Sequence, residues 1–265
     1  MRVIVTRPDR DARVWVRDLL ASGYEAAALP LIQIGAIADV SPVVNAWGRL
    51  HDYVGVMFVS GNAVDYFFSA KPSSAKGFKH GSTSKTRAWA TGPGTSRALL
   101  RAGLESDCVD APDLASAQFD SENLWLRVSH QVHAGDRVLI VRGSDGTGGN
   151  HSIAGSGRDW FANRLSSVGA AADFVATYQR SSPQFSPADV AMARHAAEDG
   201  AVWLLSSTEA VANLKAWLPQ QSWGHARALA THPRIAAAAK AAGFGVVQES
   251  RPTLAAVVAS IESMT

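Results

Sequence analysis

The sequence predicts an α/β protein made of two similar doubly wound parallel-sheet lobes, joined by two extended β-type linkers, with a ligand cleft between the lobes. Two observations lead to this fold class. Short apolar runs alternate with amphipathic stretches along the chain, a pattern typical of parallel sheets covered by helices on both faces. Related segments also recur a domain length apart, as at residues 58–64 and 204–211, which indicates two similar domains and not a solenoid.

The first βα unit begins with a buried-strand run at residues 3–5, after which Asp9 is expected to cap a helix that ends at Gly23. Further strands are expected at residues 26–34, 54–59, 88–91, 138–141, 171–178, 202–205, 228–231 and 245–248. Helices are expected between them, at residues 61–70, 95–102, 122–132, 159–167, 187–198, 208–218, 234–242 and 254–262.

Length and composition fit two lobes that each bury a core. The chain has 265 residues, of which 47% are hydrophobic and 18% are charged. No apolar run approaches the ~18 residues of a membrane span, and no signal peptide is recognisable. A single cysteine, Cys108, fits a reducing compartment. We therefore expect a cytoplasmic protein with no membrane partner, and the net charge of +2 is too small to indicate nucleic-acid binding.

Functional residues of parallel sheets gather at the carboxyl ends of the strands. Small, hydroxylated or basic side chains follow the predicted strands at residues 6–7, 60–62, 91–95, 142–143, 206–208 and 231–234. Hydroxyls and the free N–H groups of helix starts bind carboxylates or phosphates. Ser, Thr and Asn are also ordinary helix N-caps, and for any single hydroxyl capping alone is the more common explanation. Their recurrence in both halves favours a binding cleft.

Motifs along nearly the whole chain resemble the uroporphyrinogen-III synthase family. They are Thr6-Arg7-Pro8, Leu29-Pro30-Leu31, residues 58–64, Gly92-Pro93-Gly94-Thr95, Ser121-Glu122, residues 139–143, Tyr178-x-Arg180, Ser206-Ser207 and Thr253. The turn His232-Pro233-Arg234-Ile235 lacks a threonine that the family often has there, which leaves open whether Thr231 replaces it. Residues 144–157 are also longer than the family's usual short Gly-rich turn.

The resemblance implies a discontinuous arrangement of domains. Lobe 1 would comprise residues 1–35 and 181–265, lobe 2 would comprise residues 36–180, and the linkers would lie near residues 31–38 and 175–183. The repeat alone is equally compatible with two tandem lobes that divide near residue 135. Two extended crossings would act as a hinge, so variable opening of the cleft is expected.

The resemblance also implies the chemistry. The family's substrate is hydroxymethylbilane, a linear tetrapyrrole with several carboxylates. It loses its hydroxyl as water to give an azafulvene-like cation, which the terminal pyrrole attacks at its substituted carbon to form a spiro intermediate. Fragmentation and closure then invert that ring and give uroporphyrinogen III, in haem biosynthesis. Since the substrate closes unaided to the uninverted isomer, the protein must chiefly hold one conformation.

Carboxylate recognition suggests roles for particular residues. Three arginines are candidates for pairing with substrate carboxylates: Arg7, Arg142 and Arg234. Other donors would be Ser60, Asn62, Thr95, Ser206, Ser207 and Thr231. Tyr178 is the candidate general acid, with its phenol donating to the departing hydroxyl. In the alternative interpretation, its ring packs on a linker strand and its hydroxyl reaches water.

Partners and cofactors follow from the same resemblance. It implies a monomer that needs no metal or organic cofactor, takes a polycarboxylate tetrapyrrole as its small-molecule substrate, and makes a transient contact with the preceding enzyme of the pathway. The histidines lack partners at zinc spacing, and Cys108 is expected to be inert. The Gly-rich residues 143–157 match no phosphate-loop pattern.

Two other functions remain as alternatives. A non-catalytic two-lobed binding protein for a small anionic ligand would use the same strand-end donors, although such proteins are normally exported. A nucleotide-sugar transferase would carry an acidic metal motif or a diphosphate loop, and Asp145 and Asp159 do not form one.

Overall fold

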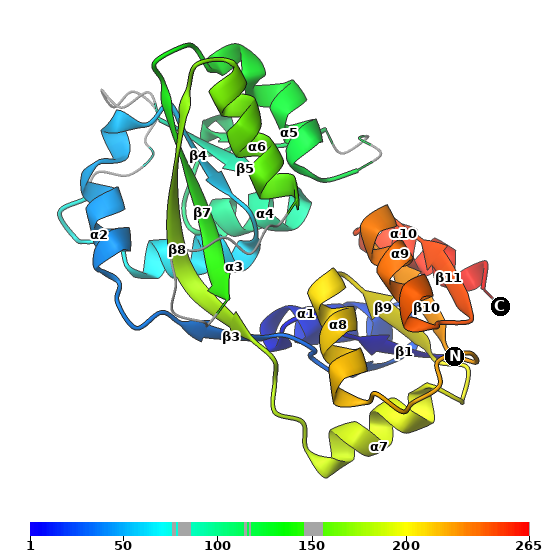
Figure 1. The fold of residues 1–265 in the computed structure, drawn as a ribbon. Coiled ribbons are helices and arrows are strands. Elements are labelled where there is room, and N and C mark those ends of the chain that lie inside the picture. The colour runs from blue at the N-terminus through cyan, green and yellow to red at the C-terminus, as the bar shows by residue number, and fades with distance from the viewer. Residues whose placement is uncertain (76–77, 79–85, 114–115, 117, 146–155, 265) are drawn as a thin grey trace. The chain divides into compact units, whose positions relative to one another are not determined.

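The computed structural model describes residues 1–75, 78, 86–113, 116, 118–145 and 156–264. Most of the Gly-rich stretch 144–157 therefore lies outside the described residues. The chain forms two compact units, which we describe separately (Figure 1). Unit 1 consists of Met1–Gln33 and Ser181–Thr265, and unit 2 consists of Ile34–Arg180.

Unit 1 contains a five-stranded sheet with the strand order β11-β10-β9-β1-β2, and every neighbouring pair in it is parallel. Its strands are β1 (Arg2–Val5), β2 (Glu25–Ala28), β9 (Val202–Leu205), β10 (Arg227–Ala230) and β11 (Val246–Glu249). Its helices are α1 (Asp9–Ala21), α7 (Pro187–Ala196), α8 (Thr208–Trp217), α9 (Pro233–Ala242) and α10 (Leu254–Glu262).

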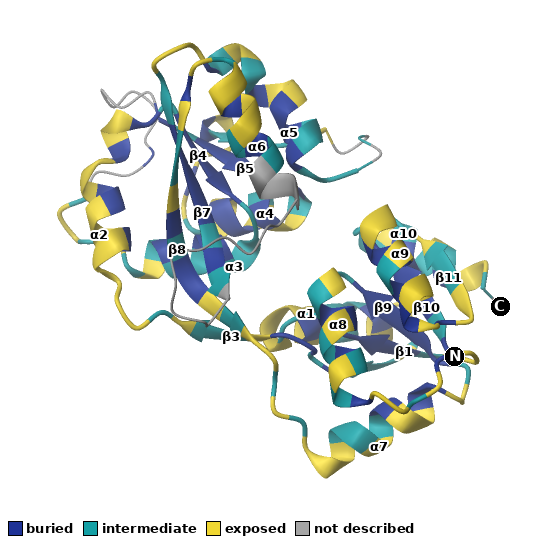
Figure 2. Cartoon of the chain, in the orientation of Figure 1, coloured by how far each residue is buried: buried dark blue, intermediate teal, exposed yellow. Residues whose placement is uncertain are grey.

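Helices cover both faces of this sheet because successive strand residues point to opposite sides. Val3 and Val5 pack with residues of α1 and α10 in one cluster. On the other face, the indole Nε1 of Trp203 donates to the carbonyl of Ala196 in α7, and its ring meets the ring of Trp223 edge-on. The central strands are accordingly buried while the outer surfaces of the helices are exposed (Figure 2).

Unit 2 contains a six-stranded sheet with the order β3-β8-β7-β4-β5-β6. Its strands are β3 (Gln33–Ala36), β4 (Gly55–Phe58), β5 (Arg87–Ala90), β6 (Val109–Asp110), β7 (Arg137–Asp145) and β8 (Ala171–Ser181). Its α-helices are α2 (Ser41–Gly48), α3 (Gly61–Ser69), α4 (Pro93–Arg101), α5 (Ser121–Val128) and α6 (Ser156–Ser167). Short 3-10 helices lie at Leu50–Asp52, Ser106–Cys108 and Ser129–Gln131.

Alternation along β4 again divides the core into two layers. Phe58 joins a cluster with α2 and α3, in which the rings of Trp47 and Phe67 stack with centroids 4.5 Å apart. Met57 points the other way, into a cluster with Trp125 of α5 and Phe161 of α6. The sheet is thus covered on both faces, as a doubly wound fold requires.

The two sheets share one strand order. The order β11-β10-β9-β1-β2 of unit 1 corresponds to β6-β5-β4-β7-β8 of unit 2. The predicted fold class, two similar lobes with parallel sheets, is confirmed. The chain order differs, since β1, α1 and β2 begin the chain whereas their counterparts β7, α6 and β8 come last in unit 2.

Several predicted elements were wrong in detail. Residues 26–34 are not one strand: β2 ends at Ala28 and β3 begins at Gln33, in different sheets. Pro30 explains the break because it has no N–H to continue a ladder. Asp9 is the first residue of α1, and the N-cap is Pro8. The helix α2 was not among the predicted elements, although Pro42 at its start is a typical signal.

No helix in the described part of the chain combines the length and the apolar character that crossing a membrane requires.

Candidate functional site

The carboxyl ends of the strands of unit 2 bring several predicted site residues to one edge of its sheet. Phe58 of β4 pairs with Ala90 of β5 and with Val141 of β7. After these positions β4 and β5 end and lead into Ser60 and the loop before α4, whereas β7 continues beside β8 through Arg142 to Asp145. Ser60, that loop and Arg142 therefore follow the paired positions at the same edge.

Ser60 has two partners at this edge. As the N-cap of α3, its Oγ accepts a hydrogen bond from the backbone N–H of Ala63 at 3.1 Å. The same Oγ lies 3.1 Å from the hydroxyl of Tyr178, and either of these two groups can be the donor. Asn62 follows in the first turn of α3 and is half-buried. Capping and a shared hydroxyl contact thus coexist at Ser60.

Tyr178 lies on β8 with only 4% of its surface exposed. Its ring packs in the same cluster as Phe58, Trp47 and Phe67 and lies near the ring of Tyr66, with centroids 5.8 Å apart. The alternative interpretation expected a packed ring, which the structure has, and a hydroxyl in water. The structure instead places the hydroxyl against Ser60, at the start of α3.

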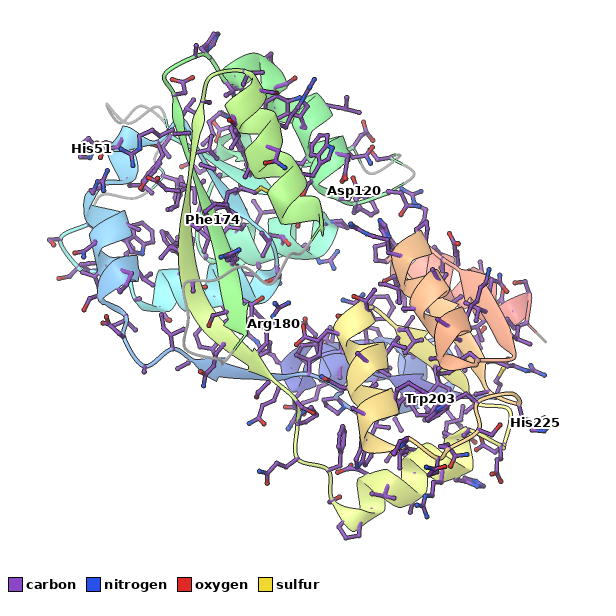
Figure 3. All side chains as sticks on the ribbon, viewed as in Figure 1. His51, Asp120, Phe174, Arg180, Trp203 and His225 are labelled. Atoms are coloured by element: carbon purple, nitrogen blue, oxygen red, sulfur yellow. The ribbon has the colours of Figure 1, made fainter. Side chains whose placement is uncertain are left out.

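Thr95 and Arg142 complete the candidates in unit 2. Thr95 is in the first turn of α4, which begins with Pro93, and is only 6% exposed. Arg142 is half-buried, and its guanidinium carbon lies 4.7 Å from the ring centroid of Phe174, which Figure 3 labels on β8. The aromatic face attracts the guanidinium by a cation–π interaction.

Unit 1 gathers its candidates at the corresponding edge. Val5 of β1 pairs with Leu204 of β9, which in turn pairs with Leu229 of β10. The hydroxyl of Thr6 donates to the carbonyl of Leu204 at 2.8 Å and so fixes the turn into Arg7. Arg7 is half-buried and lies 5.0 Å from the ring centroid of Trp15.

Among the helices that begin at this edge, α8 and α9 follow the central strands β9 and β10. Ser207 caps α8, since its Oγ accepts from the N–H of Glu209 at 3.1 Å, and Ser206 beside it is half-buried. His232 caps α9, since its Nδ1 accepts from the N–H of Arg234 at 3.1 Å. Arg234 is exposed in the first turn of α9.

The position of Thr231 bears on the missing family threonine. Because α4 begins with Pro93 and α9 with Pro233, Ile235 is the counterpart of Thr95, and both are 6% exposed. Thr231 lies ahead of the cap of α9 and is 8% exposed. It therefore does not occupy the position of the absent threonine.

Sequence reasoning missed two features of this edge. The imidazole of His232 acts as a helix cap, a role that its position before Pro233 could have indicated. Arg251 follows β11 as Arg7 follows β1, and Thr253 then caps α10 by accepting from the N–H of Ala256. The rule that selected the other strand ends would also have selected Arg251.

Other features of unit 2 lie apart from these residues. Burial raises the pKa of the Cys108 thiol, which disfavours the reactive thiolate. Among the described side chains, no group of three His, Cys, Asp or Glu residues is placed to hold a metal ion. A hollow between α5 and α6 contains no predicted site residue and is lined by Glu122, Asn123, Trp125, Leu126, Trp160 and Arg164.

The two edges offer the same chemistry. Each has helix N-termini, whose first N–H groups lack helical partners, together with at least one arginine. Such a combination binds carboxylates. Unit 2 adds a pair of touching hydroxyls, those of Ser60 and Tyr178.

Comparisons with known proteins agree on one family. The family model described as uroporphyrinogen-III synthase HemD matches residues 13–259. A uroporphyrinogen-III synthase of Chlorobaculum parvum is 29% identical over 148 residues, which are 54% of this chain and 53% of that protein. The chain thus matches about half the length of this relative.

Two solved structures share the fold. One is a mutant uroporphyrinogen III synthase from the extremely thermophilic bacterium Thermus thermophilus, with a TM-score of 0.56, 15% identity and coverage of 100% of this chain and 98% of that chain. The other is a uroporphyrinogen-III synthetase from Helicobacter pylori, with a TM-score of 0.55, 14% identity and coverage of 100% of both chains.

Proposed function

Because this chain belongs to the uroporphyrinogen-III synthase family, we propose that it is a cyclising lyase that converts hydroxymethylbilane to uroporphyrinogen III in haem biosynthesis. The structural observation that carries the proposal is the matched pair of strand-end edges, one in each unit. Each edge offers helix N-termini and arginine, which suit a substrate with several carboxylates.

Each unit supplies candidate partners for carboxylates. Arg7 and Arg234 of unit 1 and Arg142 of unit 2 pair with them in this proposal. The remaining donors are hydroxyls, amides or N–H groups in or next to the first turns of helices: Ser60, Asn62, Thr95, Ser206, Ser207 and Thr231. The burial of Thr95 in the first turn of α4 favours a contribution from its backbone N–H group. The N–H of Thr231 already donates to the carbonyl of Leu205, so its hydroxyl would be the donor there.

Tyr178 would act at the leaving hydroxyl. As the C–O bond breaks, the departing oxygen takes the phenol proton and leaves as water, and the remaining carbon becomes the azafulvene-like cation. The terminal pyrrole then attacks at its substituted carbon, and the spiro intermediate fragments and closes. The proton lost at the final closure returns to the phenolate, so the enzyme is regenerated.

Location and assembly belong to the same proposal. The protein would work in the cytoplasm as a monomer, without a metal or organic cofactor, and would briefly contact the enzyme that supplies its unstable substrate. The single cysteine and the small net charge of +2 support a reducing compartment and an anionic small-molecule ligand.

Product analysis tests the proposal. The purified chain is incubated with freshly generated hydroxymethylbilane, the products are oxidised, and the uroporphyrin isomers are separated by chromatography. We expect mainly the type III isomer. Type I isomer formed at the rate of a protein-free sample would reject the synthase and leave a non-catalytic binding protein as the alternative.

A further inference from the structure

Gly143 of β7 leaves room for the ring of Tyr178. A Cβ atom at residue 143 would lie 2.5 Å from Cε2 and 2.6 Å from Cζ of that ring, closer than real Cβ atoms approach other atoms. Both distances involve atoms of the Tyr178 ring, which is itself only 4% exposed, so little can shift to relieve them. The ring therefore occupies the space that a side chain at 143 would need.

A register shift between the strands brings these two residues together. Arg142 pairs with Ala176, but Gly143 pairs with Tyr178, so Thr177 is an extra residue in β8. Val175 and Tyr178 consequently lie in the same buried cluster, although residues three apart in a regular strand point to opposite faces. Such a bulge re-aims the side chains that follow it. Here it turns Tyr178 toward α3.

Further contacts hold the re-aimed residue. The hydroxyl of Thr177 lies within 3.4 Å of the carbonyl of Arg142, and the Oγ of Ser144 donates to the carbonyl of Tyr178 at 3.3 Å. At the other end of the ring, the Tyr178 hydroxyl meets Ser60. Contacts with β7 thus hold the backbone of β8 at Tyr178, and the start of α3 holds its hydroxyl.

The proton arrangement at Ser60 matters for the chemistry. Its oxygen accepts from the N–H of Ala63, and its own hydrogen is available to donate. When Ser60 donates to the phenol oxygen, Tyr178 keeps its proton for a second acceptor. When Tyr178 donates to Ser60, that proton is held within the protein.

We propose that Gly143, the bulge beside it and Ser60 are a positioning device for Tyr178, with Gly143 seating the ring and Ser60 orienting the hydroxyl so that its proton faces the substrate. The proposal rests on the proposed function and deepens it. Gly143 then affects activity through the position of Tyr178, without contacting the substrate itself.

The test is a double-mutant cycle with Gly143→Ala and Tyr178→Phe, read as kcat and KM for the type III isomer. We expect Gly143→Ala to lower kcat nearly as far as Tyr178→Phe does, with KM changed less than about twofold. In the double variant, Gly143→Ala should cause no further loss, since it acts through the phenol. Independent, multiplicative losses would overturn the proposal.

Gly55 provides a matched control. A Cβ at Gly55 would lie 2.4 Å from the Trp89 ring, so Gly55→Ala creates the same kind of glycine–aromatic clash at the amino end of β4. We expect it to lower Tm as Gly143→Ala does, while the folded fraction keeps its kcat. An equal loss of kcat in Gly55→Ala would show that general strain, and not the seat of Tyr178, controls activity.

A variant at Ser60 covers the case in which Gly143→Ala folds poorly. Ser60→Gly preserves an acceptable N-cap but removes the hydroxyl, and we expect it to lower kcat more than it raises KM. A raised KM with unchanged kcat would leave Ser60 only the role of carboxylate donor proposed above and overturn its positioning role.

Solvent-perturbation difference spectra give a readout that needs no substrate. The difference between the spectra of the wild type and Tyr178→Phe isolates the Tyr178 phenol, and we expect added cosolvent to leave this signal unperturbed. When Gly143→Ala is introduced into both proteins, added cosolvent should perturb the signal. A phenol that stays shielded in the Gly143→Ala proteins would overturn the role of Gly143 in positioning the Tyr178 ring. This outcome is independent of the proposed function, which fails separately if the wild type makes no type III isomer.

Discussion

Tyr178 carries the proposed general-acid step, so a substitution at this residue tests the proposed chemistry directly. Tyr178→Phe keeps the packed ring and removes only the hydroxyl, so the free energy of unfolding should fall by about 1 kcal/mol, the net worth of one hydrogen bond. We predict that kcat falls by roughly 10²–10⁴-fold, the usual contribution of a general acid. Isomer-resolved steady-state kinetics measures it, and unchanged turnover at saturating substrate would remove Tyr178 from the mechanism.

Tyr53 makes a second prediction at this scale, away from the site. Burial, together with a hydrogen bond donated to Asp173, raises the pKa of Tyr53 to about 12. That value exceeds the ~10 of an unfolded tyrosine. The contribution to stability is therefore complete below pH ~10 and is lost as the pH rises toward about 12.

Ultraviolet titration of tyrosinate checks this prediction. The chain has four tyrosines, and Tyr53→Phe should remove the component that ionises near pH 12. A titration curve that Tyr53→Phe leaves unchanged at high pH would contradict the assigned environment.

Single residues also show how much of the candidate site could be predicted from the sequence. Ser60 and Ser207 could be selected because a hydroxyl directly after a buried strand and before a helix is either a cap or a donor, and both are caps. The contact between Ser60 and Tyr178 could not be foreseen. It depends on a bulge that shifts the register of β8 by one residue, and no local pattern marks that shift.

At the scale of elements, α7 tests the capping argument. The Oγ of Ser186 accepts from the N–H of Asp189 at 3.2 Å, and the Asp189 carboxylate accepts from the N–H of Ser186 at 2.8 Å. We predict that Ser186→Ala lowers the free energy of unfolding by about 1 kcal/mol without changing kcat. Denaturant unfolding measures the change, and Ser186→Asn, which retains a capping oxygen, is the control. Equal losses in both variants would argue against the cap.

The elements themselves were largely predictable, and the errors have physical reasons. Apolar runs fix the central strands β1, β4, β9 and β10 because both faces of these strands are covered. The prediction of one strand at residues 26–34 was wrong because the apolar residues continue through Pro30, whereas the strand that pairs with this stretch changes from β1 to β8. Hydrophobic periodicity does not record which sheet a residue joins.

At the scale of the whole molecule, the repeat reveals two lobes but not how the chain is shared between them. Equivalent strands have similar patterns in either layout, so tandem and discontinuous arrangements are indistinguishable locally. The structure divides the chain between Gln33 and Ile34 and again between Arg180 and Ser181. The boundaries inferred from the resemblance were at residues 35/36 and 180/181. Long-range pairing, such as Val5 with Leu204, is what sequence periodicity leaves out.

Ionic strength gives a prediction for the molecule as a whole. If Arg142 and the other candidate arginines pair with substrate carboxylates, added salt should raise KM, on the order of tenfold between low and high salt, with little change in kcat. Arg142→Ala should weaken this dependence. Arg101→Ala should not, because Arg101 is exposed in the last turn of α4, at the opposite end of the helix from the site. Equal salt dependence in all three proteins would contradict carboxylate pairing by Arg142.

The most direct measurement of the central claim follows product isomers over many turnovers, with hydroxymethylbilane in large excess over the chain. The account predicts type III isomer in amounts far above one equivalent, at a rate proportional to protein concentration, while type I declines in the same sample. Type III limited to about one equivalent, or type I alone at the rate of the protein-free sample, would contradict it.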